Sequence, residues 1–255
     1  MLVRKSLLFC AMIFAAIGAL GALSARAAET ANVQDLKLKA ADGVTVYGTL
    51  YRAEHPKAII LLFHQAGSNS GEYAPIAPRL NKEGYSALAI DQRAGNDMFD
   101  HVNQTVKTIG HDASYLEAEP DLEAALTYAG TQHLPVAVWG SSYSSSLVFL
   151  LAAKHPHEIK AVLSFSPGEY LGAPTMVRDA AAKVAVPIYV TSAKDPEEIA
   201  NAKTILAASP SKVKTQFVPK IAGIHGSSTL HSDRNPEGSA ENWKAVLSFL
   251  NGVFK

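Results

Sequence analysis

Ser142 has the surroundings that point most directly to chemistry. It is the middle residue of 140–144 (GSSYS), which approximates the G-x-S-x-G pattern of a nucleophile elbow. In that pattern the serine occupies a strained turn between a strand and a helix, and the residues two positions away are small because larger side chains would collide with the backbone. An apolar run precedes it at 136–139, and apolar helix formers follow at 147–153. We therefore expect Ser142 at a helix N-terminus, where partial positive charge favours the anionic intermediate of a nucleophilic attack.

A polar loop without chemistry is the alternative interpretation of this run. Ser144, Ser145 and Ser146 follow directly, and short patterns of small residues occur by chance in many chains. The place of the motif among the other elements of the chain favours the elbow.

The elements that would position Ser142 can be followed in the hydropathy pattern. Residues 33–39 and 44–51 alternate apolar and polar side chains around Asp42 and Gly43, which predicts an antiparallel hairpin. Continuous apolar runs, each typical of a strand buried on both faces, follow at 58–63, 87–90, 136–139, 161–165 and 187–190. Helical segments alternate with these runs, at 73–81, 122–129, 147–153, Pro196–Ala208 and 243–250.

This alternation predicts an α/β fold of three layers. A mostly parallel central sheet, with the hairpin at its N-terminal end, would be covered by helices on both faces, and the site would lie at the carboxyl ends of the strands. A chain of 255 residues with 48% hydrophobic residues suits a single domain over 28–255. Only roughly twenty residues separate the strands at 161–165 and 187–190, so we expect no large cap domain. The polar stretch 96–115 is expected to be a functional loop.

The first 27 residues have the pattern of a secretory signal peptide. Arg4 and Lys5 precede an apolar stretch at 7–23, and residues 25–27 read A-R-A, as at a cleavage site. The apolar stretch is short for a membrane span and contains two glycines. We expect cleavage, no stable membrane span afterwards, and export to the periplasm or the medium.

Charge and cysteine content exclude several classes of function. Basic and acidic residues number 23 each, and removing Arg4, Lys5 and Arg26 with the expected signal leaves 20 basic against 23 acidic residues, a net charge of −3. Such a chain has no electrostatic footprint for nucleic acid. Cys10 is the only cysteine and lies in the signal segment, so no disulfide framework and no thiol nucleophile are expected. None of the nine histidines forms an H-E-x-x-H pair, and we expect no metal and no cofactor.

Three further segments complete a recognisable order of motifs. They are 63–68 (FHQAGS), 91–95 (DQRAG) and 225–226 (HG). With the elbow they resemble the H-G-x-G oxyanion loop, the D-x-R-G loop and the late catalytic histidine of the α/β-hydrolase superfamily, and in size and arrangement the chain resembles its dienelactone-hydrolase-like serine hydrolases. The resemblance covers essentially the whole chain after the signal. Gln65 stands where the family usually has glycine, and Ser144 replaces the last glycine of the elbow.

The resemblance implies a catalytic triad in the chain order serine, acid, histidine. Asp195 is the predicted acid because it follows the apolar strand at 187–190. An aspartate followed by Pro196 and two glutamates is also a good helix N-cap, and both roles stay open. Asp179 and Glu197 are the reserve candidates for the acid.

His225 is the predicted general base. It follows the last apolar strand, 215–218, and Gly226 lets its loop bend towards the serine. His231, six residues further on, is the reserve candidate.

The resemblance also implies an oxyanion hole made of backbone amides. One donor is expected to be Tyr143, directly after the nucleophile, and the other Ala66, with Gln65 as the alternative. His64 is expected to be a structural residue that shapes this loop. Arg93 is expected to brace its own loop through ion pairs, with contact to a substrate carboxylate as the alternative.

These inferences predict a serine hydrolase that cleaves a carboxylic ester or related acyl bond of a small-molecule or acyl-ester substrate. A peptidase or amidase with the same triad remains open, because no feature of the sequence separates an ester from an amide. A binding protein on a hydrolase scaffold also remains open, because Gln65 and Ser144 depart from the family pattern. The sequence leaves the oligomeric state undetermined.

Overall fold

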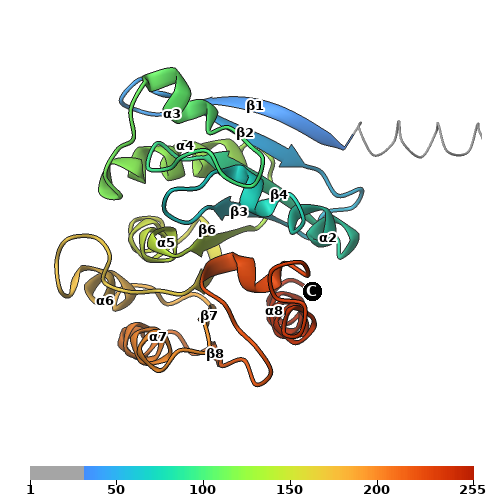
Figure 1. The fold of residues 1–255 in the computed structure, drawn as a ribbon, viewed down its shortest axis with the longest axis vertical. Coiled ribbons are helices and arrows are strands. Elements are labelled where there is room, and N and C mark those ends of the chain that lie inside the picture. Colours follow the sequence, from blue (N-terminus) through green and yellow to red (C-terminus); the bar gives the residue numbers. More distant parts are fainter. Residues whose placement is uncertain (1–31) are drawn as a thin grey trace, which may run out of the picture. The chain divides into compact units, whose positions relative to one another are not determined.

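A computed structural model describes residues 32–255, and in this part of the chain eight strands form one sheet (Figure 1). The expected signal peptide, residues 1–27, lies outside the described residues. The strands are β1 (Val33–Lys39), β2 (Thr45–Tyr51), β3 (Ala58–Phe63), β4 (Tyr85–Asp91), β5 (Val136–Ser141), β6 (Ile159–Phe165), β7 (Ile188–Thr191) and β8 (Lys214–Phe217). Their order in the sheet is β1-β2-β4-β3-β5-β6-β7-β8. Residues Asp35–Lys255 form one compact unit.

The predicted N-terminal hairpin is confirmed. The turn between β1 and β2 is closed by hydrogen bonds from Ala40 N to Val44 O and from Gly43 N to Ala40 O, both of 2.9 Å. Gly43 has a φ of 91°, a left-handed conformation that glycine adopts without steric cost. β2 then pairs antiparallel with β4, which joins the hairpin to the parallel strands.

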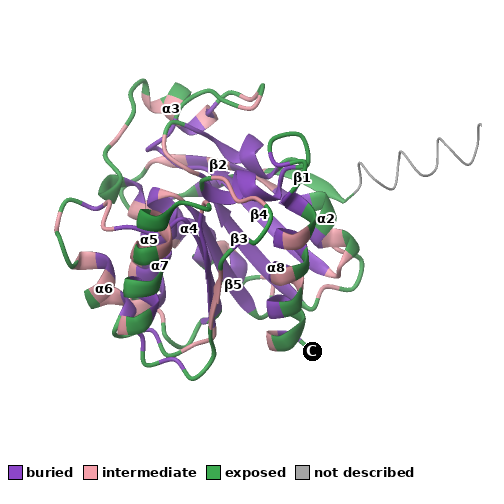
Figure 2. Cartoon of the chain, turned by 60° about the horizontal axis from the view of Figure 1, so that its bottom comes forward, coloured by how far each residue is buried: buried purple, intermediate pink, exposed green. Residues whose placement is uncertain are grey.

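The central strands are parallel and buried on both faces, as their continuous apolar runs predict. Every residue of β3, β4 and β5 is buried, and β3 lies between β4 and β5, parallel to both. Figure 2 shows these strands as the buried interior, while the helices outside them are exposed on their outer sides. The sheet therefore supplies the rigid frame on which the loops at its carboxyl edge are mounted.

Helices cover both faces of this sheet. One hydrophobic cluster joins the sheet to α4 (Glu119–Gly130), α5 (Tyr143–Lys154), α6 (Met176–Ala181) and α7 (Pro196–Ala208). A second cluster on the other face joins it to α2 (Ala77–Lys82) and α8 (Ser239–Val253). The remaining helices are short: α3 (Gln104–Ile109), η1 (Ser70–Tyr73), η2 (Leu116–Ala118) and η3 (Gly226–Leu230), of which the last three are 3-10 turns.

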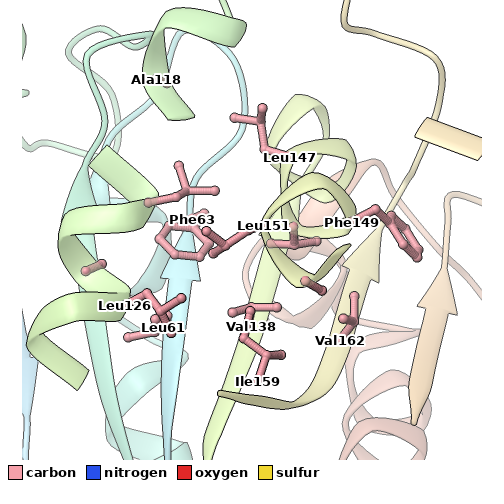
Figure 3. Packing of buried hydrophobic residues seen from close by; sticks show 14 of the residues in the cluster. Leu61, Phe63, Ala118, Leu126, Val138, Leu147, Phe149, Leu151, Ile159 and Val162 are labelled. Atoms are coloured by element: carbon pink, nitrogen blue, oxygen red, sulfur yellow. The ribbon is translucent and has the colours of Figure 1, made fainter. Parts of the chain in front are cut away.

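Figure 3 shows the packing of the first cluster around the helix that follows the elbow. Leu61 and Phe63 of β3, Val138 of β5, and Leu147 and Leu151 of α5 are all fully buried. Burying one such side chain contributes about 1.5–3 kcal/mol. This packing fixes α5, and with it the turn that precedes α5, against the centre of the sheet.

Two short α-helices of the described residues, α3 and α6, were not predicted from the sequence. α3 lies within the polar stretch 96–115, where Asn103 caps it by accepting from Val106 N, and Gly110 ends it with a φ of 83°. α6 lies in the connection from β6 to β7, and no larger insertion occupies that connection. Helices of six residues span fewer than two turns, too few for a periodic apolar pattern to register.

The sheet order places a topological switch point at the carboxyl edge, between β3 and β5. Phe63 at the end of β3 is in register with Gly140 near the end of β5. The chain leaves β3 towards β4 on one side and leaves β5 towards β6 on the other. Loops that diverge in this way open a space between them, which is where open α/β sheets hold ligands. Among residues 32–255, no helix is long and apolar enough to cross a membrane.

Candidate active site

The turn predicted around Ser142 is formed between β5 and α5. Ser142 has φ 56° and ψ −122°, a left-handed conformation that is strained for a residue with a side chain. A Cβ atom at Gly140 would lie 2.1 Å from Ser144 O, so only glycine fits there. Ser142 is partly exposed although both of its neighbours are buried. Its hydroxyl is therefore presented at the carboxyl edge of the sheet.

Ser144 replaces the expected glycine without disturbing this turn because its hydroxyl has partners in the core. Its Oγ donates to His64 O (2.6 Å) and accepts from Gln92 Nε2 (2.9 Å). Gln92 is fully buried and also donates from Nε2 to Tyr143 Oη (2.8 Å). These bonds tie the start of α5 to the loops that follow β3 and β4.

His225 lies within hydrogen-bond distance of Ser142. The segment between β8 and α8, orange to red in Figure 1, carries it to the end of β5, and its Nε2 is 2.8 Å from Ser142 Oγ. Its Nδ1 is 2.8 Å from Glu198 Oε1. A carboxylate only accepts hydrogen bonds, so Nδ1 carries the proton and Nε2 is left to accept the proton of Ser142. This is the geometry in which an imidazole activates a serine hydroxyl.

The prediction that Asp195 orients this histidine is wrong. Asp195 is the N-cap of α7, and its Oδ1 accepts from Glu197 N (2.9 Å) and Glu198 N (3.1 Å). Its carboxylate is thus committed to the helix end, the alternative role that the sequence left open. Neither reserve acid makes a hydrogen bond to His225 within residues 32–255: Glu197 is exposed, and Asp179 in α6 accepts from Thr175 Oγ1.

Glu198 occupies the position that was assigned to Asp195. Its other oxygen, Oε2, accepts from Ala193 N (3.0 Å), so both oxygens are fixed. Burial raises the pKa of Glu198, but hydrogen bonds from His225, Ser166 and Ala193 N outweigh it and hold that pKa below its ordinary value. Glu198 also lies in the first turn of α7, where the helix dipole favours a negative charge.

The hydrogen bond to Glu198 has the opposite effect on its partner. It raises the pKa of His225, and the charges of Glu198 and Glu72 add to this, while burial acts against it. The side chain of His225 is 42% exposed, so solvent and substrate reach the ring from one side.

A sequence signal for Glu198 existed in the pattern Asp195-Pro196-Glu197-Glu198. An acid three residues after an N-cap belongs to a capping box, in which its side chain turns back over the start of the helix. Here that side chain turns back to Ala193 N and His225. Glu198 is thus the residue of the first turn of α7 whose side chain contacts His225.

The two candidate donors of the oxyanion loop differ in their hydrogen bonding. Gln65 N donates to Glu72 Oε2 (2.8 Å), so its hydrogen is already engaged. The Ala66 amide donates no hydrogen bond within residues 32–255. Tyr143 is the first residue of α5, so its N–H has no partner one turn earlier in the helix. This pattern favours Ala66 over Gln65 as the partner of Tyr143.

His64 and Arg93 are structural residues, as expected. His64 is buried, with Nδ1 2.8 Å from Gln65 O and Nε2 accepting from Gln92 N (2.9 Å), and burial lowers its pKa. Arg93 is buried between Asp42 and Asp121 and pairs with both. The two residues brace the loops after β3 and β4.

The reserve base, His231, is held away from Ser142. Its Nε2 contacts Glu72 O (2.7 Å), and its ring packs against Phe99. Burial lowers the pKa of His231. It supports the backbone behind the site.

The chain is similar to known hydrolases in sequence and in fold. The family described as serine aminopeptidase, S33 matches residues 54–219, more than half of the chain. No curated protein matches the sequence.

Several solved structures share the fold. A dienelactone hydrolase from Anabaena variabilis is 19% identical with a TM-score of 0.66, over 88% of this chain and 100% of that one. A thermostable carboxyl esterase from Bacillus coagulans is 16% identical with a TM-score of 0.67, over 88% and 99%. An esterase from Pyrococcus furiosus is 18% identical with a TM-score of 0.63, over 88% and 91%. These likenesses establish the α/β-hydrolase fold.

Proposed function

The chain belongs to the serine aminopeptidase S33 family of α/β-hydrolases, and on that premise we propose that it hydrolyses a carboxylic ester or related acyl bond by way of Ser142, His225 and Glu198. The observation that carries the proposal is the continuous chain of hydrogen bonds from Ser142 Oγ to His225 Nε2 and from His225 Nδ1 to Glu198 Oε1, each of 2.8 Å.

The first step of the proposed reaction forms an acyl-enzyme. Ser142 Oγ attacks the carbonyl carbon while its proton passes to His225 Nε2, and the carbonyl electron pair moves onto oxygen. The amides of Tyr143 and Ala66 would then donate to this oxyanion, and each such donor stabilises the transition state by about 3–4 kcal/mol. Glu198 stabilises the imidazolium that forms. The tetrahedral intermediate collapses when His225 gives its proton to the departing alkoxide.

Water completes the reaction by the same route in reverse. His225 takes a proton from water, the hydroxide attacks the acyl carbon, and the carboxylic acid leaves as Ser142 Oγ recovers its proton from His225. Metal ions and cofactors take no part in these steps.

An ester is the favoured substrate, and an amide is the second candidate. The similar structures are described as esterases and a dienelactone hydrolase, which supports ester cleavage. The description of the family as aminopeptidases supports an amide instead. A panel of p-nitrophenyl esters, lactones and aminoacyl amides separates the two, and turnover of the amides with none of the esters would reverse the preference.

Covalent capture tests the catalytic serine itself. A fluorophosphonate probe should label the wild-type protein at Ser142, and the label should be absent from Ser142→Ala. Ser209→Ala is the matched control and should still be labelled, since Ser209 is a buried serine at the end of α7 whose Oγ donates to Val184 O. A wild-type protein that is not labelled would support a binding protein on a hydrolase scaffold.

We further propose that the protein is exported after cleavage near residue 27. The charged, apolar and A-R-A segments of residues 1–27 support this. The N-terminal sequence of the protein recovered from a periplasmic extract tests it, and an intact N-terminus in the cytoplasm would contradict it.

A further inference from the structure

Glu72 is a buried carboxylate directly behind the catalytic groups, and the steps above do not use it. It has no solvent exposure. Its Oε2 accepts from Gln65 N (2.8 Å) and its Oε1 from Ser141 Oγ (2.7 Å). Ser141 Oγ in turn accepts from Ser227 N (2.8 Å). One side chain thus connects the oxyanion loop, the residue before the nucleophile, and the segment that carries His225.

The connected residues lie within two positions of the groups that react. Gln65 precedes Ala66, Ser141 precedes Ser142, and Ser227 lies two residues after His225. The space between them is full: a Cβ atom at Gly226 would lie 2.5 Å from Ser141 Oγ and 3.2 Å from Gln65 Oε1. Movement of Glu72 would therefore disturb all three segments together.

A carboxylate in this place has an energetic cost that a neutral side chain would avoid. Burial raises the pKa of Glu72 to about 7, although the hydrogen bonds from Ser141 and Gln65 N and the charge of His225 act against this. The titratable groups that face Glu72 are Tyr73 beside it, His225 in front, and His231, which contacts its backbone oxygen. Retaining an acid here is costly unless its hydrogen bonds and charge are used.

We propose that Glu72 is a positioning residue for the ester cleavage proposed above: by binding the Gln65 amide it leaves Ala66 as the oxyanion donor, and through Ser141 it fixes the His225 segment against the elbow. The inference rests on the proposed function. Glu72 acts through these neighbours and touches no reacting atom.

The isosteric variant Glu72→Gln tests the charge. It keeps the shape of the side chain, and we expect kcat to fall about tenfold with KM unchanged, less than the 10²–10³ lost when an oxyanion donor itself is removed. Glu72 is only partly ionised near its pKa of about 7, so His225 loses a partial negative charge, and the acid limb of kcat/KM should move slightly to lower pH. A folded Glu72→Gln protein with wild-type kcat and an unchanged acid limb would overturn the proposal.

Ser141→Ala tests the connection with the charge kept. It removes the bridge between Glu72 and Ser227, so kcat should fall by a smaller factor while the acid limb stays in place. Wild-type kcat in this variant would also refute the proposal, even if Glu72→Gln does not fold. Asp91→Asn is the matched control, because Asp91 is another buried carboxylate that accepts two loop amides, Ser70 N and Gln104 N, outside the site. It should lower stability without moving the acid limb.

A titration of the His225 ring by NMR separates this proposal from the proposed function. Glu72→Gln should lower the pKa of His225 whether or not a substrate is known. An unlabelled wild-type protein without ester turnover would refute the function alone. A wild-type protein that turns over esters, with neither kcat nor the His225 titration changed in Glu72→Gln, would refute the role of Glu72 alone.

Discussion

The assignment of Glu198 in place of Asp195 leads to the sharpest prediction. Glu198→Gln keeps the length of the side chain but removes its charge. If the new amide donates to His225 Nδ1, the ring must carry its proton on Nε2, where it cannot accept the proton of Ser142. If the amide oxygen faces Nδ1 instead, the tautomer is correct but the imidazolium loses its counter-charge. Either arrangement slows the acylation step.

The size of the loss follows from the exposure of the pair. Removing the charge of a deeply buried triad aspartate costs about 10⁴ in kcat. Here the side chains of His225 and Glu198 are 42% and 21% exposed, so solvent screens part of their interaction. We therefore expect kcat to fall by about 10²–10³, which corresponds to about 3–4 kcal/mol of transition-state stabilisation.

Steady-state hydrolysis of a p-nitrophenyl ester measures this loss, with active sites counted by fluorophosphonate capture. Asp195→Asn is the matched control, because asparagine caps a helix as well as aspartate does, and its kcat should stay within about twofold of the wild type. Glu198 is not the acid that orients His225 if Asp195→Asn is as damaging as Glu198→Gln, or if Glu198→Gln retains full activity.

Three further predictions concern pH and the supports of the site. Glu198 raises the pKa of His225, and His225 must be neutral to act as the base. We therefore expect kcat/KM to fall as the pH drops through a value above 6.5, the pKa of an ordinary histidine. An acid limb below pH 6.5 would contradict this. Ser144→Ala removes the hydroxyl that donates to His64 O and one of the two acceptors of the Gln92 amide nitrogen, and it should lower the free energy of unfolding in urea by about 1–3 kcal/mol. An unchanged midpoint would show that these bonds contribute nothing. Arg93→Met leaves Asp121 buried without its counter-charge and should lower the free energy of unfolding by about 3–5 kcal/mol. A smaller loss in the double variant Arg93→Met with Asp121→Asn would identify the unpaired charge of Asp121 as the cause.

The sequence predicted the centre of the sheet well because the central strands are buried on both faces. Each run, such as 58–63 or 136–139, is continuous and apolar, and the residues on either side of it are polar or break the pattern. The hairpin was predicted for a different reason, since the turn at Gly43 has its own local signature. α3 and α6 gave no such signal, because short helices depend on single caps such as Asn103 rather than on periodicity.

The candidate site was only partly predictable because its residues meet through long-range contacts. Ser142 and His225 are each the prominent member of a loop, and order along the chain was enough to select them. The candidates for the acid were Asp195, Asp179 and Glu197, and Glu198 was not among them. The correct choice depends on which side chain leaves the first turn of α7 towards the histidine. Asp195 caps α7 instead of contacting the histidine, and chain order alone does not reveal this.

The hydrogen bonds of Ser144 restrict the order in which positions 144 and 92 could be substituted during evolution. Its hydroxyl is one of the partners that allow the Gln92 amide to be buried, and Gln92 also holds the ring hydroxyl of Tyr143. Glycine at 144 would remove that partner, so we expect it to be tolerated better with an apolar residue at position 92. The two positions should therefore vary as a pair through evolution, and ancestral reconstructions that change one without the other should express poorly.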